Sequence, residues 1–146
     1  MIPEIGQFAL ILALCISLVQ GTLPLIGAHK GRAEWLALAR PAAQTTFVML
    51  ATIYRFGAVW GGHEGSLLLW VLLLSAWGIA VAHYSRTLDD TMVGRVLGVI
   101  GLVTCGLLLF ILFTSNPFDR LLPAAENGRD LNPLLQDPGL VFHPPM

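Results

Sequence analysis

The sequence predicts an all-α, polytopic transmembrane protein with three well-defined spans and one marginal span. Hydrophobic residues make up 55% of the 146 positions and charged residues only 12%. That charged fraction is about half of what an ordinary soluble domain carries. Three stretches also lack any charged side chain over a length that suits a lipid bilayer. Because backbone amides find no water in lipid, such stretches are expected to be helical.

The first predicted span covers residues 5–28. At about 1.5 Å per helical residue it exceeds the roughly 30 Å hydrocarbon core. We interpret it as a span rather than a cleaved signal peptide, because residues 1–4 contain no Lys or Arg and the apolar run is longer than a signal sequence needs. Residues 65–82 form a second uncharged run, and residues 96–115 form a third, which stops at the helix-breaking pair Asn116-Pro117.

The remaining predicted span, residues 42–60, is marginal. Pro41 suits the first turn of a helix and the run up to Tyr54 is mostly apolar, but Arg55 interrupts it before a full crossing. If the helix extends to Trp60, Arg55 lies close enough to its end to reach the membrane interface. If this segment does not cross, everything after it lies on the opposite side of the membrane.

The distribution of basic residues indicates an orientation. With four spans and an external N-terminus, five basic residues lie in internal loops and three lie outside. The internal set is Lys30, Arg32, Arg40, Arg86 and Arg95, and the external set is Arg55, Arg120 and Arg129. Since internal loops are enriched in Lys and Arg, both the N-terminus and the C-terminal tail are expected outside. The tail, residues 119–146, is rich in proline and turn dipeptides and is predicted to be a loop.

Composition and motifs narrow the function classes. A net charge of −1 lacks the basic footprint of nucleic-acid binding, so no nucleic-acid partner is expected. Cys15 and Cys105 lie in separate apolar runs and form neither a CxxC nor a CxxCH motif. The sequence contains no GxSxG, HExxH or phosphate-binding loop, so no catalytic residue is assigned. The three well-defined spans have no internal charge of the kind that marks a transport path.

The first group with chemical potential lies just before the span at 65–82. Trp60, His63 and Glu64 place an aromatic ring, an imidazole and a carboxylate at the predicted membrane boundary. Glu64 and Ser66 also suit a helix start, since acidic and hydroxyl groups pair with free N–H groups there. Helix capping and interfacial anchoring are therefore the simpler explanation for this group, and a functional surface is the alternative.

The second group is Phe142-His143-Pro144-Pro145. Proline after His143 disfavours the helical conformation at that residue, and a neutral imidazole is a good axial ligand for haem iron. One histidine specifies no metal by itself, so an exposed loop histidine is the simpler explanation on these grounds alone.

These motifs carry a resemblance to a known family. Four segments closely resemble the amino-terminal part of the haem lyase subunits of cytochrome c maturation, the CcmF/NrfE family. They are MIPEIG at residues 1–6, WGGHEGSLLLW at 60–70, LFILFTSNPF at 109–118, and GRDLNPLLQDPGL at 128–140 followed by FHPP at 142–145.

The resemblance implies a multi-pass protein of the bacterial inner membrane. Such a protein takes haem from a periplasmic haem chaperone, works with other cytochrome c maturation subunits, and attaches the haem to the CxxCH cysteines of apocytochrome c. It also implies that His143 is an axial ligand of the haem iron, with Trp60, His63 and Glu64 on the neighbouring surface. Both boundary motifs then face the periplasm, as does the tail.

The chain departs from the family pattern in two ways. Members continue for many more helices, including a Trp-rich WWD segment and further histidine ligands, so this chain is expected to be a fragment that ends before the next span and is inactive as a lyase on its own. Members also have a complete second span and an outer loop before the Tyr-Arg pair. Here Tyr54-Arg55 follow Met49-Leu50 almost directly, which indicates that a stretch is missing.

A second hypothesis is a non-catalytic membrane assembly subunit that does not bind haem. Gly94, Gly98 and Gly101 would let a partner helix approach the start of the last span. A small transporter is a third possibility, ranked last because of the uncharged spans.

Overall fold

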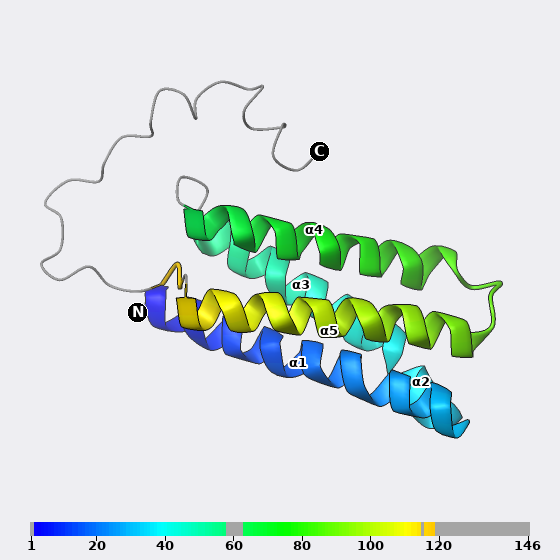
Figure 1. The fold of residues 1–146 in the computed structure, drawn as a ribbon. Helices are drawn as coiled ribbons and strands as arrows, with labels where there is room; N and C mark the ends of the chain where they lie inside the picture. The colour runs from blue at the N-terminus through cyan, green and yellow to red at the C-terminus, as the bar shows by residue number, and fades with distance from the viewer. Residues whose placement is uncertain (1, 58–62, 115, 119–146) are drawn as a thin grey trace, which may run out of the picture.

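The computed structural model describes residues 2–57, 63–114 and 116–118, and these residues form helices with no strand among them. The helices are α1 (Ile2–Lys30), α2 (Ala33–Ala37), α3 (Ala39–Gly57), α4 (His63–Tyr84) and α5 (Asp90–Thr114). The four long helices run alternately in opposite directions, so that the start of α1 and the end of α5 lie at the same end of the bundle (Figure 1). We call this the tail end, and the opposite end, which contains α2, the α2 end. The predicted all-α fold is confirmed.

All four long helices are long and apolar enough to cross a membrane. The spans are Glu4–Lys30, Ala33–Tyr54, Ser66–Tyr84 and Asp90–Thr114. The second of these, which the sequence made marginal, is the least apolar of the four but is helical throughout α2 and α3 apart from the turn at Leu38. Pro41 lies in the first turn of α3, where its missing N–H removes no intrahelical hydrogen bond.

The link from α1 into α2 depends on one glycine. Gly31 has a φ of 66°, in the left-handed region that glycine adopts most readily. The Arg32 N–H donates to the Gly27 carbonyl at 2.9 Å, which closes the last turn of α1 in the manner of a Schellman motif. This tight stop reverses the chain and brings α3 back along α1.

The core at the tail end draws on every long helix. Leu10, Leu50, Leu68 and Leu108 come one from each of α1, α3, α4 and α5, and each is 0% exposed. They belong to one cluster of buried apolar residues that includes Phe118. A smaller cluster, which includes Ala39, Ala82 and Leu97, lies at the α2 end. Buried apolar clusters therefore lie at both ends of the bundle, and the one at the α2 end draws on α3, α4 and α5.

The glycines of α5 allow a close helix approach, as the sequence predicted, and the approaching helix is α1 of the same chain. A Cβ built on Gly101 would lie 2.7 Å from the Gly21 backbone N, and one built on Gly98 would lie 2.6 Å from Leu25 Cγ. A Cβ on Gly94 would lie 2.4 Å from Leu36 Cδ2 of α2. The glycine face that a partner helix would need is thus already occupied.

Candidate functional site

The tail end gathers segments that are far apart in sequence. The start of α1, the end of α3, the start of α4 and the end of α5 meet there (Figure 1). Three of the family-like segments, at residues 1–6, 60–70 and 109–118, therefore have described residues at one end of the bundle. This end is the candidate functional site.

Phe118 ties the end of α5 to the start of α1. The helix ends at Thr114, as the Asn116-Pro117 pair predicted, and the Phe118 N–H donates to Asn116 Oδ1 at 3.1 Å. Phe118 is 9% exposed, and a Cβ on Gly6 would lie 2.2 Å from its Cε1 atom. Gly6 thus leaves the space that the phenylalanine ring fills, and Phe118 lies beside the first turns of α1.

The predicted site residues are described only in part. His63 and Glu64 are the first two residues of α4, so the helix start expected near Glu64 and Ser66 is present at the tail end. Trp60 and His143 lie outside the described residues, as does the whole of the predicted 119–146 loop. The structure therefore describes the helix ends that precede Trp60 and residues 119–146 in the sequence.

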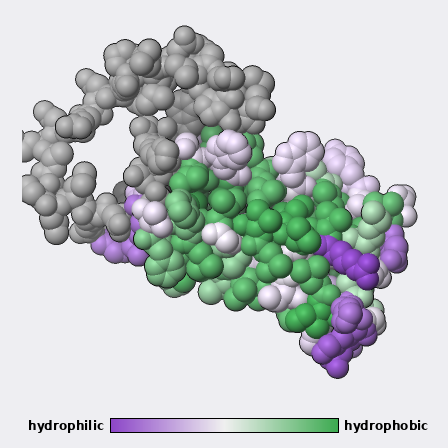
Figure 2. All heavy atoms as spheres, viewed as in Figure 1, coloured by the Kyte–Doolittle hydropathy of each residue, from purple (hydrophilic) through white to green (hydrophobic). Residues whose placement is uncertain are grey.

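The charges are distributed unequally between the two ends. Figure 2 shows a mostly hydrophobic surface along the described bundle, with hydrophilic residues gathered at the α2 end. The five basic residues assigned to internal loops all lie at that end, at the end of α1, around α2, at the start of α3, between α4 and α5, and in the first turns of α5. Arg55 lies in the last turn of α3, at the tail end.

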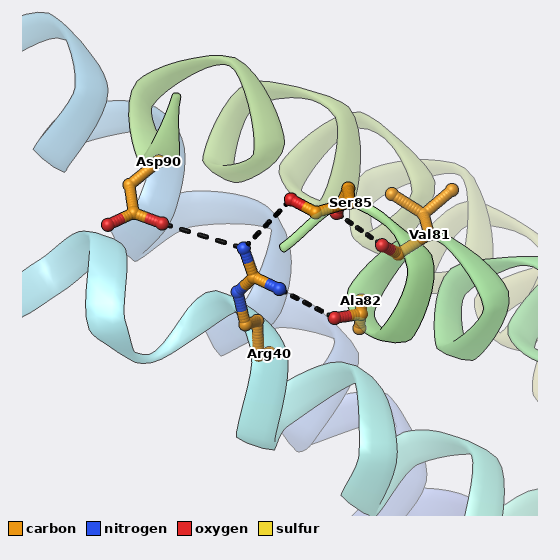
Figure 3. A network of polar contacts seen from close by, with 5 residues as sticks. All are labelled: Arg40, Val81, Ala82, Ser85 and Asp90. Atoms are coloured by element: carbon orange, nitrogen blue, oxygen red, sulfur yellow. Dashed lines mark hydrogen bonds and ion pairs between the residues drawn. The ribbon is translucent and has the colours of Figure 1, made fainter. Parts of the chain in front are cut away.

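Arg40 organises the polar contacts of the α2 end (Figure 3). Its guanidinium donates to the Ala82 carbonyl at 2.6 Å and to the Ser85 carbonyl at 3.3 Å, and lies 3.5 Å from a carboxylate oxygen of Asp90. Ser85 in turn donates through its hydroxyl to the Val81 carbonyl. Arg40 therefore joins the start of α3 to the end of α4, where the last carbonyl groups of the helix lack helical partners. Through Asp90 it also contacts the start of α5.

A buried polar layer crosses the middle of the bundle, and sequence reasoning missed it. Gln20 is 2% exposed, donates to the Leu97 carbonyl at 3.0 Å, and accepts from the Thr46 hydroxyl at 3.1 Å. Ser17, Ser75 and Thr104 are also buried. The Thr104 hydroxyl has no hydrogen-bond partner among the described residues. The sequence could have indicated this layer, because single polar residues interrupt the apolar runs and such residues rarely face lipid.

Other residues with chemical potential lie elsewhere. His29 and His83 are at the α2 end, where the His83 ring packs edge-on to Tyr84 at 5.2 Å between centroids. Cys15 is exposed, Cys105 is buried, and both are free thiols. Within the described part of the chain, no three His, Cys, Asp or Glu side chains come together as a metal site.

The tryptophans of α4 face outward. Trp70 and Trp77 are 54% and 70% exposed, and their spacing of seven residues places them on the same face of the helix. That face points away from the core of the described bundle and suits contact with lipid or protein.

Comparison with known proteins identifies the chain's relatives. The family model described as "Cytochrome C assembly protein" matches residues 60–146. The cytochrome c-type biogenesis protein CcmF of Pseudomonas aeruginosa is 49% identical over 176 residues, and that of Escherichia coli is 47% identical over 176 residues; each match covers 100% of this chain and 27% of the relative. The probable cytochrome c-type biogenesis protein NrfE of Escherichia coli is 52% identical over 104 residues, covering 71% of this chain and 19% of the relative. No solved structure matches the chain.

The chain thus spans about a quarter of the length of these CcmF relatives. The alignments are also longer than the chain itself, at 176 positions against 146 residues, so at least 30 positions of each relative have no counterpart here. This agrees with the expectation that a stretch is missing. The matched span, the identities and the coverage of this chain lead to one conclusion: the chain belongs to the cytochrome c assembly protein family, which includes the CcmF and NrfE proteins.

Proposed function

We propose that this chain acts in cytochrome c biogenesis as the amino-terminal membrane section of a haem lyase. It lies in the bacterial inner membrane with its tail end toward the periplasm. The N-terminus and the tail are then periplasmic, and the α2 end faces the cytoplasm. Support comes from the family membership and from the five basic residues at the α2 end, because cytoplasmic loops carry an excess of Lys and Arg.

The observation that carries this proposal is the even number of long helices in the described part of the chain. Four crossings return the chain to the side on which it started, and the end of α5 lies at the same end of the bundle as the start of α1. Phe118, packed against Gly6, also lies at the end of the bundle where α1 begins. A periplasmic tail gives the FHPP motif access to haem and to apocytochrome c.

His143 is the proposed axial ligand of the haem iron, with Trp60, His63 and Glu64 on the neighbouring surface. A neutral imidazole is the chemistry that haem iron requires. His63 begins α4 at the tail end, whereas His29 and His83 lie at the α2 end. In the proposed orientation His63 is therefore on the periplasmic side, and His29 and His83 are on the cytoplasmic side. In this proposal a periplasmic haem chaperone delivers haem, apocytochrome c receives it through its CxxCH cysteines, and other maturation subunits complete the assembly.

Chemical labelling tests the orientation. In a background with Cys15→Ser and Cys105→Ala, single cysteines replace Ala125 in the tail and Thr87 between α4 and α5. A membrane-impermeant maleimide added to intact spheroplasts is expected to label Ala125→Cys and to reach Thr87→Cys only after lysis. Labelling of Thr87→Cys alone before lysis would place the tail in the cytoplasm and refute the proposal.

Absorption spectroscopy tests the ligand. After reconstitution with haem and removal of the unbound haem, the purified chain is expected to show a Soret band that His143→Ala weakens and that His83→Ala, a matched change at the α2 end, leaves unchanged. A Soret band unaffected by His143→Ala, or none in the original chain, would favour a non-catalytic assembly subunit. The glycine face of α5 is occupied by α1, so such a subunit would have to contact its partners elsewhere.

The chain alone is expected not to attach haem. The 146 residues tested contain one proposed ligand and no WWD motif. Coexpression with an apocytochrome and a haem source, in a strain that lacks the intact relative, should give no covalently haem-stained product. A stained band of cytochrome size would contradict this expectation.

A further inference from the structure

A shallow groove lies between α4 and α5 at the α2 end. Its volume is about 460 Å³, and it is lined by side chains of both helices and of the loop that joins them. The lining includes Trp77, Val81 and Tyr84 of α4, Leu88 of the loop and Val96 of α5. Trp77, Tyr84 and Leu88 are each more than half exposed, so the groove is open to the surroundings of the bundle.

The groove extends from the end of α4 toward the middle of the candidate spans. Tyr84 ends α4, and Trp77 lies seven residues before it, or roughly 10 Å deeper at 1.5 Å per helical residue. Val96 lies six residues from the start of α5, at a similar depth of roughly 9 Å. The apolar lining therefore follows the path that the upper half of a lipid acyl chain takes.

Two arginines are next to lining residues in the sequence. Arg86 lies in the loop between the lining residues Ser85 and Leu88, and Arg95 immediately precedes Val96. Both side chains are exposed, and neither has an ion-pair partner in the parts of the chain that the structure describes. Arg95 sits about one and a half turns inside the span, where a long cationic side chain extends toward the phosphate level of the bilayer.

The nearby acidic groups do not cancel these charges. Asp90 is already paired with Arg40 at 3.5 Å. Asp89 precedes the first residue of α5, where the positive end of the helix dipole offsets a carboxylate. The polar end of the groove is thus suited to an anion, and its apolar part to a hydrocarbon chain.

We propose that this groove binds an anionic phospholipid of the leaflet that surrounds the α2 end. One acyl chain lies along Trp77, Val81 and Val96, and the phosphate lies between Arg86 and Arg95. A zwitterionic lipid fills the apolar part equally well but gains less from the arginines. Each basic residue near an anionic membrane surface favours the anionic lipid by about fivefold.

Fluorescence quenching by brominated lipids tests this directly. A chain with Trp35→Phe, Trp60→Phe and Trp70→Phe retains Trp77 as its single tryptophan. It is reconstituted in phosphatidylcholine vesicles that contain either brominated phosphatidylglycerol or brominated phosphatidylcholine at the same mole fraction. Trp77 is expected to be quenched as if the anionic lipid were enriched at least about fivefold beside it. The combined change Arg86→Gln and Arg95→Gln should remove this preference.

Two controls separate the groove from the general membrane surface. A chain that retains only Trp70, on the same face of α4 but outside the groove, should show no preference between the two lipids. In the chain that retains only Trp77, Arg32→Gln changes a basic residue that lies between α1 and α2 at the same end and does not line the groove, so it should leave the Trp77 preference intact.

Three results would overturn the proposal. They are equal quenching of Trp77 by both lipids, a preference that survives the double arginine change, and a Trp77 that neither lipid reaches while Trp70 is quenched. The last result would mean that protein fills the groove. Because the vesicles are symmetric, none of these outcomes depends on which way the chain is oriented or on haem.

Discussion

A pair of glycine substitutions on α5 tests how the first and last helices pack. Gly101 and Gly106 lie five residues apart on the same helix, and changing either one to alanine adds a single methyl group. Around Gly101 the new carbon would lie 2.7 Å from Gly21 N and 3.0 Å from Gln20 C, which are backbone atoms. Around Gly106 the new carbon would have no contact within 4 Å in the described part of the chain beyond its own stretch of helix. The two substitutions therefore share their chemistry and differ only in packing.

The geometry sets the size of the effect. Restoring an ordinary contact of about 3.4 Å at Gly101 requires α1 and α5 to separate by about 0.7 Å, because backbone atoms cannot rotate away. A gap of that order loses roughly a quarter to a half of each dispersion contact along the interface. We expect Gly101→Ala to lower the free energy of unfolding by about 1–3 kcal/mol. Gly106→Ala should raise it by about 0.5–1 kcal/mol, because alanine is the better helix former.

Unfolding by SDS in mixed micelles, followed by tryptophan fluorescence, measures both changes in the same detergent. Near-equal midpoints for the two variants would show that the contact between Gly101 and Gly21 does not hold the helices together. So would a Gly101→Ala chain that is as stable as the original.

Three further changes can be measured in the same assay. Arg40→Met is expected to lower the unfolding free energy by about 1–2 kcal/mol, since three oxygens lose a charged donor. Asp90→Asn changes a carboxylate that is 79% exposed and should lower it by less than about 0.5 kcal/mol. A larger loss for Asp90→Asn would show that the ion pair, and not the two carbonyl contacts, accounts for most of the effect of Arg40. Gln20→Leu should cost about 1 kcal/mol, and adding Thr46→Val should cost little more in a double-mutant cycle; full additivity would mean that the two side chains act independently. Thr104→Val should be neutral or stabilising by up to about 1 kcal/mol, because it removes, at nearly constant shape, a buried hydroxyl that has no hydrogen-bond partner among the residues that the structure describes. A clear loss of stability would reveal a partner.

The sequence predicted the helices well where lipid alone determines the pattern. Long runs without charge require helices, and the Asn116-Pro117 pair predicted the end of α5 at Thr114. The second span was harder because its apolar window is the least hydrophobic of the four and because Arg55 interrupts it. Packing against α1 and α4 lets α3 form despite that weak pattern.

Other features depend on which helices pack against each other, and the sequence of a single helix does not specify its neighbours. The glycines of α5 predicted a close approach, but only the fold shows that α1 is the helix that approaches. The sequence around Gln20 does not distinguish it from other polar residues in apolar runs. Its role in joining helices becomes visible only when the fold brings the Leu97 carbonyl and the Thr46 hydroxyl to its side-chain amide. Trp60 and His143 derive their proposed roles from the family likeness, since one aromatic ring and one imidazole do not specify a site by themselves.

The hydrogen bond between Gln20 and Leu97 joins residues 77 positions apart, which has a consequence for biosynthesis. Ribosomes add about 5–20 residues per second, so α1 reaches the bilayer roughly 4–15 s before α5 is available. During that interval the Gln20 amide must bond to Thr46 of the newly made α3, to water, or to an insertion factor that shields it. The order in which the helices emerge thus makes α1 the segment that waits longest for its final neighbour.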